Sequence, residues 1–178
     1  GVIIAFETAL VAQIFGAVIF VVNGIGIAMT RELGPLMTAI LFAGRSGSAF
    51  AAQLGTQKVN EELNALTTFG LSPIYFLVVP RLIASSLVVP LLSVFATILG
   101  ILGGGLVMAM YDITYTQFYV QLLKSVTVTD IVFGLVKAVI FGFVIALIGC
   151  QCGMNTGAGA AAVGSSTTKS VVKSIIWI

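Results

Sequence analysis

Three long stretches without any charged residue constrain this chain more than any other feature. They cover residues 8–30, 82–111 and 138–168, and each exceeds the roughly 20 apolar residues with which a helix spans a bilayer. Only 8% of the residues are charged, whereas a soluble domain has about 25%. The apolar residues follow a helical period rather than alternating with polar ones, which argues against an outer-membrane barrel. The sequence therefore predicts an all-α, polytopic transmembrane helix bundle.

Composition also excludes several classes of function. Eight basic and six acidic residues cannot form a basic patch dense enough for nucleic acid. The chain has no histidine, and Cys150 and Cys152 are too close in sequence for an ordinary disulfide and too few for a metal site. The dipeptide Gly-Lys of a phosphate-binding P-loop is absent. We therefore expect no catalytic residues, metal or cofactor in this chain, and a function other than that of an enzyme.

Apolar periodicity divides the chain into about five membrane helices. We predict a first helix over residues 1 to about 15, a second over 17–52 interrupted near Gly34 and Pro35, a third over 74–111 and a fourth over 131–150. A last helix begins near Thr168. The chain starts without Met and stops after about half of a final span, so we interpret it as a fragment whose first and last helices are truncated. The glycines at 103–105 indicate either close packing or a loosened helix.

Small residues recur every fourth position on two of these helices. Rows of this kind let helix backbones approach closely within a membrane. The predicted helix-packing residues are Ala39, Ala43, Gly47 and Ala51 on the second helix, and Gly134, Ala138, Gly142 and Ala146 on the fourth. A neighbouring row comprises Gly44, Ser48 and Ala52. We expect these faces to pack against another helix or a second copy of the chain.

The most polar stretch, residues 55–73, contains a predicted amphipathic helix over residues 56–69. Val59, Leu63 and Leu66 form its apolar stripe. Five of the six basic residues at membrane edges flank this segment or the Gly-rich loop near residue 157, which places both in the cytoplasm and residues 111–130 on the outer side. The helix is either an interfacial anchor or a docking element for a soluble protein. Acids on its polar face favour docking, because anionic headgroups would repel them.

Arg31 and Glu32 interrupt an apolar run, where an unpaired charge is costly. Either they neutralise each other or a neighbouring helix at a bundle contact, or they line a polar or lipid-filled cavity where Pro35 opens the helix. Lys137 lies about 10 Å inside the fourth helix at 1.5 Å per residue. We interpret Lys137 as extending its side chain to the membrane boundary.

Two segments resemble a known family. They are RELGPLMTAILFAGRSGSAFAAQLGTQKVNEELNALTTFGLSPIYFLVVPRLIA, residues 31–84, and NTGAGAAAVGSSTTKSVVKS, residues 155–174. Both are similar to the MlaE family of ABC-transporter permeases, which move phospholipids or other lipids between membranes. The chain departs from the family pattern at Gln53, Asn64, Ser72 and Ala161, where acidic residues are usual.

The resemblance implies that residues 1–178 form one permease domain in the inner (plasma) membrane, behind an N-terminal interfacial helix. It implies a homodimer that works with two ATPase subunits, which bind ATP and Mg²⁺, and with a ring of MCE lipid-binding subunits on the outer face. Some systems add a STAS-domain protein. Phospholipid would move between the inner and outer membranes, and Arg31 and Glu32 would lie at the lipid cavity. Residues 55–73 would couple to the ATPase, with contacts from Lys58, Val59, Glu61, Glu62, Leu63 and Leu66.

Two other functions remain open from the residues alone. An ATP-independent channel or secondary transporter would use Arg31, Glu32 and Lys137 as a polar relay for an ion or proton. A membrane scaffold would only hold other subunits together.

Overall fold

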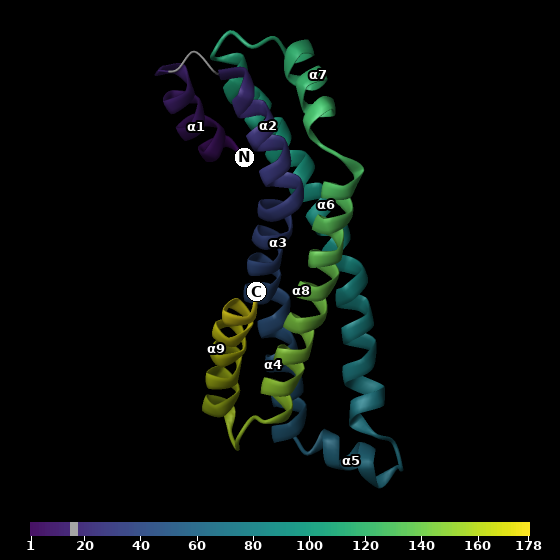
Figure 1. Ribbon diagram of the computed structural model, residues 1–178. Helices are drawn as coiled ribbons and strands as arrows, with labels where there is room; N and C mark the ends of the chain where they lie inside the picture. The colour runs from purple at the N-terminus through teal and green to yellow at the C-terminus, as the bar shows by residue number, and fades with distance from the viewer. Residues whose placement is uncertain (15–17) are drawn as a thin grey trace. The chain divides into compact units, whose positions relative to one another are not determined.

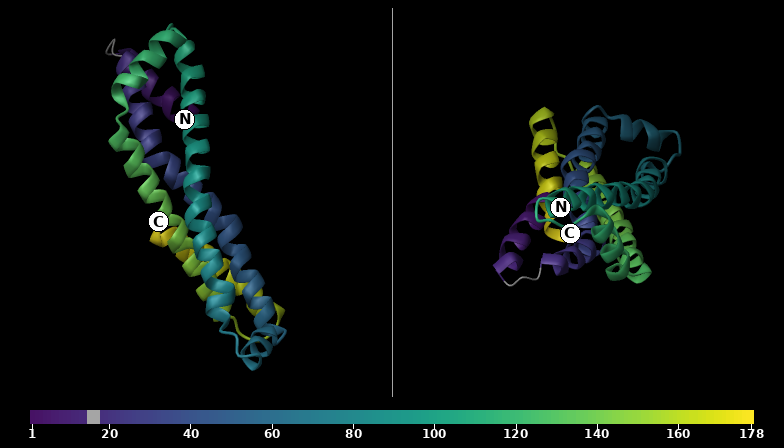
Figure 2. Two further views of the ribbon diagram at one scale, coloured as in Figure 1. Left: turned by 90° about the vertical axis from the view of Figure 1, so that its right-hand side faces the viewer. Right: turned by 90° about the horizontal axis from the view of Figure 1, so that it is seen from above.

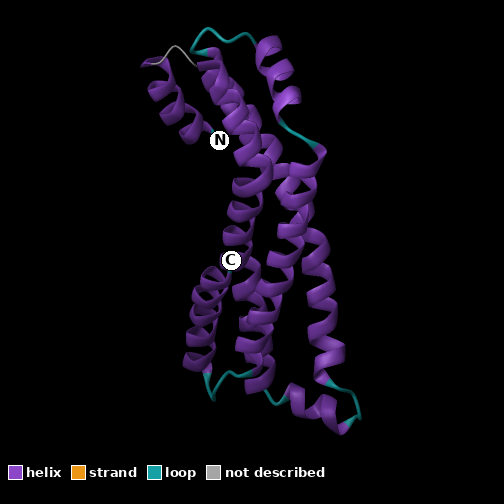
Figure 3. Cartoon of the chain, in the orientation of Figure 1, coloured by secondary structure: helices purple, strands orange, loops and turns teal. Residues whose placement is uncertain are grey.

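A computed structural model describes residues 1–14 and 18–178, and in that part of the chain every regular element is a helix (Figures 1 and 3). Three helical segments are long and apolar enough to cross a membrane: Val18–Val59, Ile74–Ala109 and Val128–Met154. Helix α1 (Val2–Ile14) is shorter but also apolar. The predicted class, an all-α transmembrane bundle, is confirmed. The predicted junction between the first two helices, at residues 15–17, lies outside the described residues.

The second predicted helix is continuous, and the interruption that we expected near Gly34 and Pro35 is wrong. The segment consists of α2 (Val18–Ala28), the π-helical turn η1 (Met29–Leu33), α3 (Gly34–Phe42), a second π-helical turn η2 (Ala43–Gly47) and α4 (Ser48–Val59). In η1 the Gly34 N–H donates to the Met29 carbonyl, five residues back. This wider turn lies immediately before Pro35, so the ring is accommodated without ending the helix.

The remaining helices follow the sequence prediction more closely. The π-helical turn η3 (Ile74–Val78) leads into α6 (Val79–Ala109), with Pro90 inside it. Helix α7 (Tyr115–Ser125) lies within the predicted excursion at 111–130 and begins with a capping box formed by Thr114 and Gln117. Helix α8 (Val128–Met154) starts two residues before the predicted end of that excursion, and α9 (Ala160–Trp177) starts before Thr168.

The glycines at 103–105 serve close packing. All three lie within continuous α6, and a Cβ added at Gly103, Gly104 or Gly105 would stand 2.8 to 3.3 Å from a side chain of another segment. The opposing side chains are those of Val2, Ile25 and Phe118. The helix is therefore not loosened at this point; the glycines let α1, α2 and α7 approach it.

One compact unit comprises residues 1–37 and 91–137. Its core is an apolar cluster contributed by α1, α2, η1, α6 and α7, and it includes Ala5, Val22, Ile25, Met108 and Phe118. Helices α2 and α7 lie beside each other (Figure 2), joined by a hydrogen bond from the Gln121 side-chain amide to that of Asn23 at 2.9 Å. The Thr97 hydroxyl also donates to the Met29 carbonyl at 3.3 Å, which fixes α6 to the π-helical turn.

A second compact unit comprises residues 38–90 and 138–178. Helices α4 and α9 pack along each other in this unit (Figure 1). Ser166, Ser170 and Ser174 recur every fourth residue of α9 and are all buried, and the Ser170 hydroxyl donates to the Gly47 carbonyl at 3.3 Å. Small serines thus allow α9 to approach the small-residue face of η2 and α4.

The predicted helix-packing residues lie inside these units. Ala39, Ala43, Gly47 and Ala51 are buried, as are Gly134, Ala138, Gly142 and Ala146. A Cβ on Gly142 would stand 2.7 Å from the Ser85 carbonyl oxygen. In contrast, Gly44 is exposed and has no atom within 4 Å of an added Cβ. In the row of Gly44, Ser48 and Ala52, only Gly44 is therefore exposed, whereas Ser48 and Ala52 are half-buried.

Candidate functional site

Four charged side chains from η1 and α8 form a cluster in the first unit. The Lys137 ammonium contacts both Glu32 carboxylate oxygens at 2.6 Å. The Arg31 guanidinium lies 3.8 Å from the Glu32 carboxylate and 3.7 Å from that of Asp130, and its Cζ is 5.5 Å from the centre of the Phe133 ring. Two cations thus face two anions, and the cluster is neutral overall.

Asp130 is held in place by the start of α8. Its carboxylate accepts hydrogen bonds from the Thr127 N–H at 3.1 Å and from the Thr127 hydroxyl at 2.5 Å. A carboxylate in the first turn of a helix is also favoured by the helix dipole. This anchor leaves a fixed anion in front of Arg31. Sequence reasoning had assigned Asp130 to the outer-side excursion and did not identify this role.

The interpretation of Lys137 as reaching for the membrane boundary is wrong. Its ammonium instead pairs with Glu32, 105 residues earlier in the chain. Because an ion pair lowers the cost of holding a charge within a span, this contact explains how both residues are tolerated there. The side chains of Arg31 and Glu32 are still 48% and 57% exposed in the isolated chain, so the cluster presents an open polar face.

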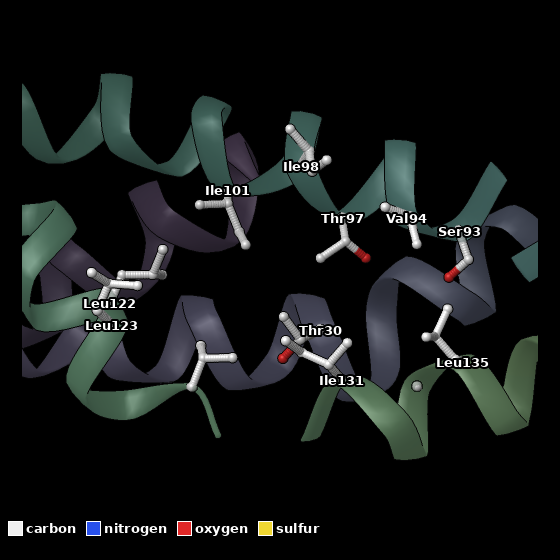
Figure 4. A pocket seen from close by; sticks show the side chains of 12 residues that line it. Thr30, Ser93, Val94, Thr97, Ile98, Ile101, Leu122, Leu123, Ile131 and Leu135 are labelled. Carbon is white, nitrogen blue, oxygen red and sulfur yellow. The ribbon is translucent and has the colours of Figure 1, made fainter. Parts of the chain in front are cut away.

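An apolar pocket of about 310 Å³ lies in the same unit (Figure 4). Residues of η1, α6, α7 and α8 line it, together with Val126 just after α7. Figure 4 shows Thr30 and Thr97 on facing sides, Ser93 and Leu135 near one end, and Leu122 and Leu123 near the other. The lining consists of Thr30, Ser93, Val94, Thr97, Ile98, Ile101, Leu122, Leu123, Val126, Ile131, Gly134 and Leu135.

The threonine hydroxyls do not make this pocket polar. Thr30 donates to the Gly26 carbonyl at 2.8 Å, and Thr97 donates to the Met29 carbonyl. Hydroxyls that are satisfied by backbone carbonyls leave their methyl groups as the free surface. Because most of the other lining residues are aliphatic, the space suits hydrocarbon, and apolar cavities of this kind take up apolar ligands rather than water.

The pocket and the charged cluster are built from the same two segments. Thr30 precedes Arg31 in η1, and Ile131 follows Asp130 in α8. Gly134 allows the two segments to approach, since a Cβ there would collide with the Thr30 carbonyl oxygen. An amphiphile could place a hydrocarbon chain in the pocket and a polar group at the cluster. The arrangement provides no nucleophile or general base poised for bond chemistry.

The predicted amphipathic helix over residues 56–69 is wrong as a single helix. Helix α4 continues to Val59, Asn60 and Glu61 form a turn, and α5 (Glu62–Thr68) begins anew. Glu61 has φ of 62°, a left-handed conformation that ends the first helix. The Asn64 side-chain amide donates to the Glu61 carboxylate and stabilises the turn. Lys58 and Val59 therefore belong to a different helix from Leu63 and Leu66.

The six residues predicted to contact the ATPase differ in how exposed they are. The Lys58 ammonium donates to the carbonyl of Met154, the last residue of α8, at 2.8 Å, a favourable place for a cation. Leu63 is only 7% exposed and packs within the chain. Val59 and Leu66 are half-buried, whereas Glu61 and Glu62 are exposed. Of these six residues, Glu61 and Glu62 are thus exposed without a contact to another helix.

The structure adds apolar residues that sequence reasoning did not select. Phe69 is 79% exposed and Leu71 is 45% exposed, and both lie in the turn that follows α5. Tyr75 and Phe76 are also exposed in η3. Two large apolar side chains at the tip of a polar turn are a feature of binding surfaces. The sequence does contain a signal for this surface, because Phe69 and Leu71 on either side of Gly70 fall outside the apolar stripe of the predicted helix.

Comparison with known proteins places the chain among transport proteins. The family model described as Permease MlaE matches residues 1–178. A probable ABC transporter permease protein of Synechocystis sp. is 38% identical over 179 residues, covering 100% of this chain and 68% of the relative. A probable ABC transporter permease protein of Rickettsia typhi is 36% identical over 180 residues, covering 100% of this chain and 69% of the relative. The chloroplastic protein trigalactosyldiacylglycerol 1 of Arabidopsis thaliana is 39% identical over 155 residues, covering 86% of this chain and 44% of that protein.

Proposed function

The chain belongs to the MlaE permease family and is the non-catalytic membrane subunit of an ABC transporter, and on this premise we propose that it moves phospholipid between the inner and outer membranes. The observation that carries the proposal is the neutral cluster of Arg31, Glu32, Asp130 and Lys137 next to an apolar pocket. A phospholipid combines the same two chemistries, a charged headgroup and hydrocarbon chains. The name of the Arabidopsis relative also refers to a diacylglycerol lipid.

The proposed assembly supplies what this chain lacks. ATP and Mg²⁺ bind to partner ATPase subunits, MCE-domain subunits receive or deliver lipid at the outer face, and a STAS-domain protein is a further candidate partner. A second copy of the chain covers the exposed position at Gly44 and the exposed side of the charged cluster. The half-exposed charges support this arrangement, because charged side chains within a membrane face the bundle interior or a water-filled cavity.

Coupling to ATP hydrolysis is proposed to use the segment from Lys58 to Leu71, on the cytoplasmic side of the inner membrane. All five basic residues that support this orientation lie in the second unit, which carries five basic and only two acidic residues. Arg31 and Lys58 belong to one helical segment, Val18–Val59. A displacement of the segment from Lys58 to Leu71 can therefore be transmitted along continuous helix towards the charged cluster. Each ATPase state then stabilises a different arrangement of the permease.

The proposed ATPase-binding surface can be tested at Phe69 and Leu71, because both side chains are exposed. Replacing Phe69 and Leu71 together by Asp should release the ATPase during co-purification, because truncating central apolar anchors commonly costs an interface about 2 kcal/mol or more each. Leu63→Ala is the matched comparison, since Leu63 is buried and should lower thermal stability first. An intact complex with the Phe69 and Leu71 double variant would contradict the assignment.

The lipid site can be tested by photo-crosslinking. A photoreactive amino acid placed at Ile98 or Leu123, both on the pocket lining, should capture phospholipid from the membrane of the intact transporter. The same group at Phe69, outside the pocket, is the control for non-specific labelling. We expect capture at the pocket positions to change when ATP is added, because the proposed cycle alters the cavity. Capture that does not depend on ATP would indicate ordinary lipid contact and would contradict a transport site.

The rival function, an ATP-independent channel or secondary transporter, is not favoured by the geometry. Arg31, Glu32 and Lys137 form one compact neutral cluster, whereas a relay requires ionisable groups in succession along a path. Membership of an ABC permease family also implies an ATPase partner.

A further inference from the structure

A small polar pocket of about 200 Å³ lies between the end of α8 and α9, within the second unit. Gln151 in the last turn of α8 and Asn155 just after that helix line the pocket together with Lys169 and Lys173 of α9. Ser166 and Cys152 complete the lining. The pocket therefore offers ammonium, amide and hydroxyl donors, and no carboxylate lines it.

Within the described residues, these donors have no intramolecular partners. Among the described residues, none of the side chains of Gln151, Asn155, Ser166, Lys169 and Lys173 makes a hydrogen bond or ion pair. Ser166 is only 8% exposed as a residue and lines the pocket wall beside the amide and ammonium donors. Several unpaired polar and cationic donors that converge on one pocket suit an anionic group from outside the chain.

The position of the two lysines is set by the serine face of α9. Ser166, Ser170 and Ser174 are buried, so Lys169 and Lys173, each one residue earlier than a buried serine, share an adjoining face beside α8. Like charges four residues apart on a helix repel each other. The only acidic residues of this unit are Glu61 and Glu62, and neither lines the pocket. An anion from outside the chain would offset this repulsion.

We propose that this pocket binds the phosphate of an anionic phospholipid from the cytoplasmic leaflet, as a site separate from the transported lipid. The proposal rests on the proposed function for the side of the membrane on which α9 lies. Apolar residues on the same helix suit a lipid rather than a soluble anion, since Val172, Ile176 and Trp177 are 52%, 75% and 71% exposed. Trp177 is one turn beyond Lys173, and tryptophan is enriched at headgroup level. The bound lipid would hold α9 against α8 and stabilise the second unit.

Lipid retention by the intact transporter tests this site. The complex is exchanged into mixtures of phosphatidylglycerol and phosphatidylcholine with identical acyl chains, and retained lipid is measured by native mass spectrometry. The wild type should retain phosphatidylglycerol preferentially, and Lys169→Gln with Lys173→Gln should reduce that preference about 25-fold, at roughly fivefold for each cation next to an anionic headgroup. Lys124→Gln, in α7 of the other unit, is the matched control and should leave the preference unchanged.

A second arm separates the possible sources of phosphate. Inorganic phosphate in place of phosphatidylglycerol should not raise the unfolding temperature of the wild type. Stabilisation by inorganic phosphate without any lipid preference would overturn the assignment to a lipid. Unchanged preference in the lysine double variant would overturn the site, and so would a loss of ATPase affinity without a change in lipid retention. ATPase release by Phe69 and Leu71 substitutions tests the transport function separately, so the two proposals can fail independently.

Discussion

Gly134→Ala is expected to destabilise the protein by about 1–3 kcal/mol, the usual cost of overpacking a well-packed site. Alanine normally favours a helix over glycine by about 0.5–1 kcal/mol, so the sign of the effect is informative. A Cβ at this position would collide with the Thr30 carbonyl oxygen and stand 3.6 Å from the Pro35 ring. Backbone cannot rotate away as a flexible side chain can, so α8 and η1 must separate. Thermal unfolding of the purified protein measures the change.

Gly24→Ala is the matched control for this substitution. Gly24 lies in α2 of the same unit, and no atom stands within 4 Å of an added Cβ. We expect a neutral or slightly stabilising effect there. Equal unfolding temperatures for the two variants would show that α8 does not depend on close approach to η1. The Gly134 variant should also lose lipid crosslinking at the pocket, because Gly134 and Thr30 both line it.

The membrane helices were predictable because their signal is local. Uncharged runs of sufficient length follow directly from the cost of exposing backbone and charge to hydrocarbon, and the spans Ile74–Ala109 and Val128–Met154 each overlap one of these runs. The small-residue rows were equally visible, since helical spacing fixes which residues share a face. Which row would be covered was not visible. Ala43 is buried and Gly44 is exposed, although both are small.

Local backbone departures could not be predicted from the same patterns. Pro35 is normally a helix breaker, and only the structure shows that a π-helical turn before it keeps the helix continuous. The left-handed Glu61 similarly divides a stretch whose apolar spacing fits one helix. Glutamate seldom adopts this conformation. Asn60 is a more common turn residue, but a single asparagine is only a weak indication of a turn.

The candidate site was half predictable. Arg31 and Glu32 stand out because charges are rare in the chain, but their partners lie about 100 residues away. Asp130 and Lys137 are seven residues apart, two helical turns, which places them along one side of α8 once that helix is known to begin at Val128. Pairing across helices depends on tertiary packing, and a single sequence does not report it.

Removing one partner of the Glu32 and Lys137 pair should be more harmful than removing both. Glu32→Gln leaves the Lys137 ammonium without the carboxylate that it contacts at 2.6 Å, and Lys137→Met leaves the carboxylate without its cation. An unpaired charge in a span costs about 2.5–3.5 kcal/mol on insertion scales. The exposed fractions of 37% and 57% mean that solvent would screen the effect in detergent, so unfolding is measured in lipid nanodiscs.

The double variant Glu32→Gln with Lys137→Met should recover most of the stability lost by either single variant, because replacing both members of an ion pair with neutral groups is often close to neutral. Glu7→Gln is the control, since Glu7 is exposed on α1 and makes no ion pair within the described residues. Lipid transport separates the two interpretations of the cluster. If the stable double variant still transports lipid, these charges serve only as a contact between helices. If it is stable but its transport rate falls at least about tenfold, the charges interact with the lipid headgroup. A loss of about 1.4 kcal/mol of interaction suffices for a tenfold change.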